Sequence, residues 1–235
     1  MKEKETGIDL KKHMLWSKRA EKAIRDDIHR RYPDSEEKIW DDTVLQYSRY
    51  LEDQPYIGGR KNRQAGGVYD SIMILSYYAA LPEKISKEEL EEINNNAFLP
   101  VYERLQGKVD ANNPFFLRIM HLAFRVVARG VKKHEGKWPG NYHMEVLPYD
   151  REEGIRYYFH SCPIADFARR VGLEDMMPCI CNADYPMLQQ MKAGLIRRHT
   201  CSNGDYCDYQ IVGDRSKLLE ENPPFRDEDG YERNR

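Results

Sequence analysis

Apolar residues in the first half of the chain recur every three or four positions, a spacing typical of amphipathic helices. The spacing predicts helices over five stretches: about residues 9–32, 34–54, 69–81, 86–105 and 113–131. Pro33 ends the first, and Pro114 opens the last, which we expect to be a central core helix. Ser86 and Glu89 form a capping-box pattern at the start of the fourth.

The pattern changes to an alternation of apolar and polar residues after about residue 140, which is typical of strands. Strands are predicted over four stretches: about residues 142–149, 155–161, 194–201 and 206–212. Asn203-Gly204 is the turn signal between the last two, and Pro163 opens a short helix that Gly172 ends. Helices followed by strands indicate an α+β fold, with an N-terminal helical bundle packed against a C-terminal antiparallel sheet with short helices.

This organisation predicts a single domain over residues 1–213, with a helical part at about 9–135 and a strand-rich part at about 141–213. Residues 214–235 are polar and charged, and we expect them to form a loosely held tail. The stretch 55–67 contains four glycines and is predicted to be a loop. It is interpreted either as a flexible connector or as a loop that folds over a ligand.

Composition and charge exclude several classes of protein. The chain of 235 residues has a net charge of −2, so it lacks the basic excess expected of a nucleic-acid binder. Its longest apolar run, residues 71–81, is far shorter than the roughly 20 residues that cross a bilayer. The charged N-terminus also lacks the apolar segment of a secretory signal. We therefore expect a cytoplasmic protein with no membrane or nucleic-acid partner, and a homo-oligomer is compatible with the sequence.

The candidate chemistry lies between residues 157 and 212, which contain all five cysteines. An odd number of cysteines in a chain of this size favours free thiols over a disulfide framework. Three pairs of cysteine or histidine residues are two positions apart in the sequence: His160 with Cys162, Cys179 with Cys181, and His199 with Cys201. Such pairs could bind zinc, but the C-x2-C spacing of established zinc sites is absent, and buried free cysteines explain the pattern more simply. We therefore assign no metal.

A second interpretation of this region is nucleophilic catalysis. A thiolate near a histidine and a carboxylate can attack an electrophilic carbon. Cys181 and Asp184 are three residues apart, so both point into one site if the segment turns, and His160 and His199 supply imidazoles. A neighbouring arginine such as Arg197 could pair with a substrate carboxylate through two hydrogen bonds.

Four short motifs follow one another here: Cys162-Pro163, Cys181-x-x-Asp184, Arg197-x-x-Thr200 and Gly204-x-x-Cys207-Asp208-Tyr209. In this order and spacing they resemble the L-2-amino-thiazoline-4-carboxylic acid hydrolase family. The element Gly58-Gly59-x-x-Asn62 is similar to a glycine-rich element of the same family, and the resemblance extends from about residue 20 to 213. The last hairpin is also similar, more distantly, to the vinyl-4-reductase-type small-ligand-binding domains.

The resemblance implies a hydrolase that opens the ring of L-2-amino-thiazoline-4-carboxylate, or of a related small cyclic amidine or amide, to an N-carbamoyl product on a route to cysteine. It implies a small-molecule substrate and no cofactor. The catalytic residues expected are Asp184, Cys181, His160 and Cys162, and the substrate-binding residues expected are Arg197, Thr200, Cys207, Asp208, Gly59 and Asn62. Two alternatives remain open, a zinc-dependent hydrolase on the same scaffold and a non-catalytic sensor of a small ligand.

Overall fold

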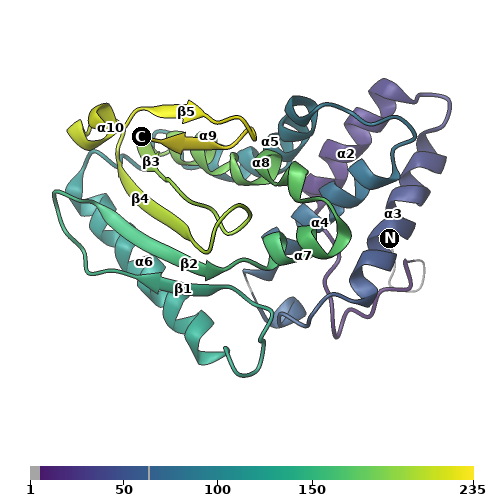
Figure 1. The fold of residues 1–235 in the computed structure, drawn as a ribbon, viewed down its shortest axis with the longest axis horizontal. Coiled ribbons are helices and arrows are strands. Elements are labelled where there is room, and N and C mark those ends of the chain that lie inside the picture. The colour runs from purple at the N-terminus through teal and green to yellow at the C-terminus, as the bar shows by residue number, and fades with distance from the viewer. Residues whose placement is uncertain (1–5, 63) are drawn as a thin grey trace.

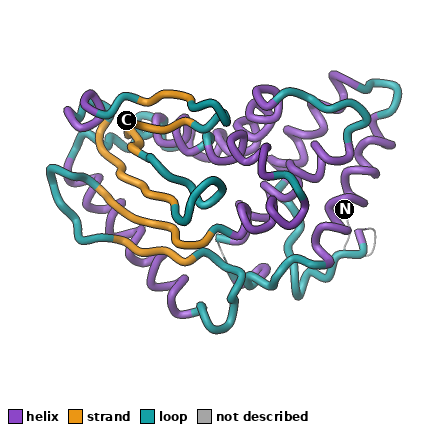
Figure 2. The backbone as a smooth tube through the Cα atoms, viewed as in Figure 1, coloured by secondary structure: helices purple, strands orange, loops and turns teal. Residues whose placement is uncertain are grey.

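A helical end and a sheet-containing end make up the protein in the computed structural model, which describes residues 6–62 and 64–235 (Figure 1, Figure 2). Among the described residues, the helical end contains α2 (Lys18–Arg31), α3 (Glu36–Glu52), α4 (Ala65–Ala80) and α5 (Lys87–Glu103). Residues 1–5, where no secretory signal is expected, and Arg63 of the glycine-rich stretch lie outside the described residues.

Helix α4 is the core of the helical end. Every residue from Val68 to Tyr77 is buried, as the apolar run in the sequence predicts. Helix α3 packs on α4, and α2 packs on α5. The capping box of α5 is present, since Ser86 Oγ accepts from the N–H of Glu89 and the Glu89 carboxylate accepts from the N–H of Ser86. None of the helices in the described ranges is both long enough and apolar enough to cross a membrane.

An antiparallel sheet with the strand order β1-β2-β4-β3 forms the other end. Its strands are β1 (His143–Val146), β2 (Ile155–Ser161), β3 (Ala193–Ile196) and β4 (Cys207–Gly213). The central pair places Tyr157 opposite Tyr209 and Phe159 opposite Cys207. Helix α6 (Pro114–Lys133) lies along β1 and β2 (Figure 1). The α+β fold predicted from the order of helices and strands is therefore confirmed.

Strand β3 is shorter than the sequence predicts, because it ends at Ile196 rather than near residue 201. Beyond this point one backbone hydrogen bond remains, from the N–H of Asp208 to the carbonyl of His199 at 3.4 Å, and a side chain supplies two more contacts. Asp208 Oδ1 accepts from the backbone N–H groups of Arg198 and His199 at 2.9 and 2.6 Å. The chain leaves the sheet here, and the side chain of Arg197 is fully buried.

Short helices return the chain from β2 to β3. They are α7 (Pro163–Val171), η2 (Glu174–Met176), α8 (Met177–Cys181) and α9 (Asp184–Gln189). Helix α7 begins at Pro163 and is followed by Gly172, whose φ of 68° is left-handed, as predicted. Because α8 and α9 follow each other directly, Cys181 and Asp184 lie at the junction of two short helices.

The C-terminal residues form a helix and a hairpin instead of a loosely held tail. The elements are α10 (Lys217–Glu221), β5 (Pro224–Arg226) and β6 (Glu232–Asn234). Asn234 is buried, and its Oδ1 accepts from the N–H of Arg197 at 2.9 Å and from the hydroxyl of Tyr185 at 3.0 Å. These contacts join segments far apart in the sequence, so the polar composition of the segment gave no sign of them.

Candidate functional site

A cavity of about 380 Å³ lies between the sheet and helices α4, α5, α6, α8 and α9. Aromatic rings contribute to its walls from α5, α6, the segment before β1, and β2 and β4: Phe98, Tyr102, Phe124, Tyr142, Tyr157, Phe159 and Tyr209. The rings of Tyr157 and Tyr209 stack with centroids 4.7 Å apart and planes 10° apart, and Phe124 stacks on Tyr157 at 4.9 Å. Strand pairing thus gives the cavity a continuous aromatic wall.

Asp184, the first residue of α9, supplies a carboxylate to this cavity. Its Oδ2 accepts from Arg197 Nη1 at 2.9 Å and from the hydroxyl of Tyr209 at 2.7 Å. Its Oδ1 makes no hydrogen bond to a described residue, and 31% of the side chain is exposed. Burial raises the pKa of Asp184, although Arg197 and the Tyr209 hydroxyl oppose the shift.

Arg197 binds Asp184 but does not itself line the cavity. Its side chain is fully buried, and Nη1 also donates to the carbonyl of Cys181 at 3.0 Å. The guanidinium lies 5.1 Å from the ring centroid of Tyr185 and 5.7 Å from that of Tyr209. Its Nε is buried without a described partner. Arg197 does not line the cavity, so its place differs from the one expected of a substrate-binding residue, and it is positioned to orient Asp184.

Three thiols line the same cavity, those of Cys162, Cys181 and Cys207. Burial raises the pKa of Cys181 to about 12, although Arg197 opposes the shift. Burial also raises the pKa of Cys162, and hydrogen bonding with Cys201 together with burial raises that of Cys207. All three are therefore neutral near pH 7. Within the described ranges, no group of three or more histidine, cysteine, aspartate or glutamate side chains is arranged to hold a metal ion.

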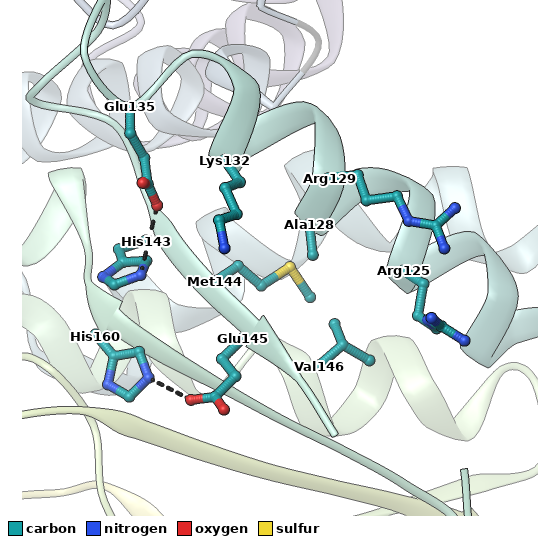
Figure 3. Close-up of a pocket in the computed structure, with 10 residues that line it drawn as sticks. All are labelled: Arg125, Ala128, Arg129, Lys132, Glu135, His143, Met144, Glu145, Val146 and His160. Carbon is teal, nitrogen blue, oxygen red and sulfur yellow. Dashed lines mark hydrogen bonds and ion pairs between the residues drawn. The ribbon is translucent and has the colours of Figure 1, made fainter. Parts of the chain in front are cut away.

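The histidines lie elsewhere. A larger cleft, of about 470 Å³, lies between α6 and the edge strand β1 (Figure 3). His160 lines this cleft, with its Nε2 at 3.0 Å from a carboxylate oxygen of Glu145. His199 is 49% exposed on the loop after β3. The smaller cavity is the candidate site, because it brings together Asp184 and the three thiols, while a catalytic role for His160 stays a prediction from the sequence.

The remaining expected binding residues, apart from Cys207, are not among the lining residues of the cavity and make local contacts instead. Asp208 shapes the loop after β3 through the hydrogen bonds described above, and the buried Thr200 contacts the Ser202 hydroxyl in the same loop at 2.8 Å. Gly59 lies in a short helix, η1 (Gly59–Lys61), and a Cβ there would meet a backbone carbonyl at 3.0 Å. Asn62 is buried and donates to the carbonyl of Ile57 at 2.6 Å. This part of the glycine-rich stretch is thus packed into the protein.

Sequence reasoning did not assign the aromatic walls. The alternation in β2 already places Tyr157 and Phe159 on one face, opposite His160, and that apolar face was the available signal. Phe124 follows the apolar face of α6 in the same way. Their convergence depends on the pairing of β2 with β4 and on the packing of α6, which are long-range contacts that a local pattern does not reveal.

The fold and the cavity define an α+β protein in which helices cover one face of a small antiparallel sheet and surround a carboxylate, thiols and aromatic rings. The sequence model of the L-2-amino-thiazoline-4-carboxylic acid hydrolase family matches residues 68–211, more than half of the chain. The chain belongs to this family, which supports a hydrolase-like function at the family level. The match includes Asp184 and the three cavity thiols but not Gly59 or Asn62. No curated protein and no solved structure matches the chain significantly.

Proposed function

We propose that the protein hydrolyses a small cyclic amidine of the 2-aminothiazoline type, with Asp184 as the general base. The carboxylate of Asp184 in the aromatic cavity carries this proposal. Arg197 and Tyr209 hold its Oδ2, which leaves Oδ1 free to accept a proton. Burial raises the pKa of Asp184, and a carboxylate with a raised pKa is a better base near neutral pH.

The chemistry of such a ring suits a single carboxylate in the wall of an apolar cavity. Carbon C2 is bonded to sulfur and to two nitrogens, so it is electrophilic. Asp184 takes a proton from water while the water oxygen bonds to C2 and the electron pair of the C=N bond moves to the ring nitrogen. The hydroxyl proton of this tetrahedral intermediate passes to the ring nitrogen, and the intermediate collapses to a C=O group with cleavage of the C2–S bond. The sulfur takes up the proton from Asp184. One water is consumed, and L-2-amino-thiazoline-4-carboxylate would give N-carbamoyl-L-cysteine.

Cys181 is the alternative nucleophile, but its state does not favour this role. With a pKa of about 12, only a very small fraction of the thiol is ionised at pH 7. Its sulfur lies 3.8 Å from the Ser202 hydroxyl, and no described histidine lines the cavity to accept its proton. The route through water needs no ionised thiol, and Arg197 and the Tyr209 hydroxyl favour the ionised form of Asp184.

The test is incubation of the purified protein with L-2-amino-thiazoline-4-carboxylate and with 2-amino-2-thiazoline, with mass-spectrometric detection of the N-carbamoyl products. We expect turnover of at least one ring, reduced about 10²- to 10⁴-fold in Asp184→Asn. Asp166→Asn removes a half-exposed carboxylate on α7 and is the matched control, which should keep the full rate. Turnover that survives in Asp184→Asn, or that is abolished by Cys181→Ser, contradicts Asp184 as the base.

A second candidate function is binding without chemistry. A largely apolar cavity with neutral thiols can hold a small ligand as a sensor does. The observation that favours it is the same set of raised thiol pKa values, which leaves Asp184 as the charged group among the described lining residues. Thermal stabilisation by a ring compound that is never converted to product would support this function over hydrolysis.

A further inference from the structure

The described residues that line the cavity include an acidic side chain but no basic one. Among the described residues that line it, Asp184 is charged, and there is no lysine, arginine or histidine. Arg197 lies behind Asp184, and its Nη1 already donates to Asp184 and to the Cys181 carbonyl. A ligand carboxylate here would lose its hydration beside a like charge, with no cation to balance it. The cavity therefore disfavours an anionic ligand.

Three cations of helix α6 line the outer cleft instead. Arg125, Arg129 and Lys132 line that cleft (Figure 3), whereas Phe124 and Val127 of the same helix line the cavity. The spacing of three and four residues along α6 keeps these cations on one side of the helix. The packing of α6 on the sheet thus separates the cations from the cavity that contains Asp184.

Two hydrogen-bond acceptors of the cavity lack partners among the described residues. Asp184 Oδ1 is free of described partners. Asn94 of α5 donates through Nδ2 to the carbonyl of Cys179 at 3.1 Å, and its Oδ1 is buried without a described partner. An amidine presents several N–H donors and carries a positive charge when protonated, so it complements these acceptors.

The remaining volume is apolar and larger than one ring requires. A cavity of about 380 Å³ falls within the roughly 300–1,000 Å³ range of sites that enclose drug-sized ligands. A thiazoline ring with a carboxylate would leave much of this space unfilled. The stacked rings of Phe124, Tyr157 and Tyr209 provide flat surfaces on which a further ring could stack.

We infer that the ligand of this cavity is a cyclic amidine with an apolar, aromatic substituent where the family's named substrate has a carboxylate. The inference rests on the proposed function for the identity of the reacting ring, and it adds the class of substituent. The amidine end lies at Asp184, and the substituent lies against the aromatic wall.

Three compounds that differ only at C4 test the inference: 2-amino-4-phenyl-2-thiazoline, 2-amino-2-thiazoline and L-2-amino-thiazoline-4-carboxylate. Kd is measured by calorimetry at pH 8, beside product formation. We expect the phenyl compound to bind about 10- to 30-fold more tightly than the unsubstituted ring, because a buried phenyl group adds apolar contact. The carboxylate should bind about tenfold more weakly than the unsubstituted ring, or worse.

Two variants and one control variant show which part of the cavity causes these differences in affinity. Phe124→Ala should reduce the phenyl preference, the ratio of the Kd values for the unsubstituted and the phenyl ring, about tenfold. Phe115→Ala is the matched control, because Phe115 lies on the same helix but is 65% exposed, and it should leave all three Kd values unchanged. Gln64→Lys introduces a cation among the lining residues and should improve carboxylate binding about fivefold or more.

The outcomes separate this inference from the proposed function. Carboxylate binding as tight as that of the unsubstituted ring overturns the inference, even if the carboxylate is hydrolysed and the proposed function stands. Tight phenyl binding without any product supports the inference and overturns hydrolysis. Absence of binding by all three compounds overturns the inference as well.

Discussion

Replacement of Arg197 by methionine would remove the cation that holds Asp184. The guanidinium is fully buried, and its Nη1 lies 2.9 Å from Asp184 Oδ2. Removal of one partner of a buried ion pair leaves the other charge uncompensated and costs about 3–5 kcal/mol of the free energy of unfolding. For a chain of this length, each kcal/mol lowers the Tm by about 2–4 °C, so Arg197→Met should lower it by roughly 6–20 °C.

The loss should grow with pH. Burial raises the pKa of Asp184 in the folded protein above its unfolded value of about 3.9, despite the opposing charge of Arg197. A group of this kind contributes most to stability below its unfolded pKa, and that contribution is lost as the pH rises through the folded pKa. Arg197→Met removes the opposing charge, so the folded pKa rises further and the loss extends to higher pH. The variant should therefore differ more from the native protein at pH 8 than at pH 5.

Urea unfolding followed by far-ultraviolet circular dichroism at pH 5 and pH 8 measures both effects. The double variant Arg197→Met with Asp184→Asn is the control, because it removes the stranded charge. It should be more stable at pH 8 than Arg197→Met alone, with a coupling free energy of about 1–3 kcal/mol between the two positions. A loss below about 1 kcal/mol, or an equal loss at both pH values, would refute the reasoning.

Three further predictions follow from the site and the sheet. Because its pKa is about 12, Cys181 should react with iodoacetamide at pH 8 about 10³-fold more slowly in the folded protein than after unfolding. Peptide mapping measures both reaction rates, and equal rates would contradict a buried neutral thiol. Tyr209→Phe removes a donor that lowers the pKa of Asp184, so the acidic limb of the pH–rate profile should move to higher pH, and an unmoved limb would exclude this contact. In urea unfolding, Gly154→Ala should destabilise the fold by about 1–3 kcal/mol more than Gly107→Ala. Both glycines have a left-handed φ, 73° and 74°. A Cβ at Gly154 would lie 2.3 Å from a carbonyl oxygen of β4, whereas a Cβ at Gly107 would have no atom within 4 Å. Equal losses would mean that the turn before β2 relaxes.

Local signals predicted much of the fold. The capping box at Ser86 and the glycine after α7 mark element ends with side-chain or backbone chemistry that acts within a few residues. The apolar run of α4 is buried where expected because its period and length leave few other arrangements. Such signals do not depend on the rest of the chain, which is why they could be interpreted from the sequence.

The candidate site was predictable only in part. The three-residue spacing of Cys181 and Asp184 does bring both to one cavity, because the chain turns between α8 and α9. The place of Arg197 behind Asp184 was not predictable, since it depends on the chain leaving the sheet at Ile196. His160 lies apart from Asp184, on the face of β2 opposite Tyr157, and alternation alone did not show which face is covered by helices.

The C-terminal hairpin is hydrogen-bonded to the backbone of Arg197. Asn234 both accepts from the N–H of Arg197 and donates to its carbonyl, and Glu232 supplies a carbonyl to the guanidinium. During synthesis, Asp184 and Arg197 leave the ribosome well before these residues do. The helical end can pack in that interval, but the site cannot reach its final arrangement until residue 234 has emerged. The site is therefore completed only after residue 234 has been synthesised, separate in time from the folding of the helices at the helical end.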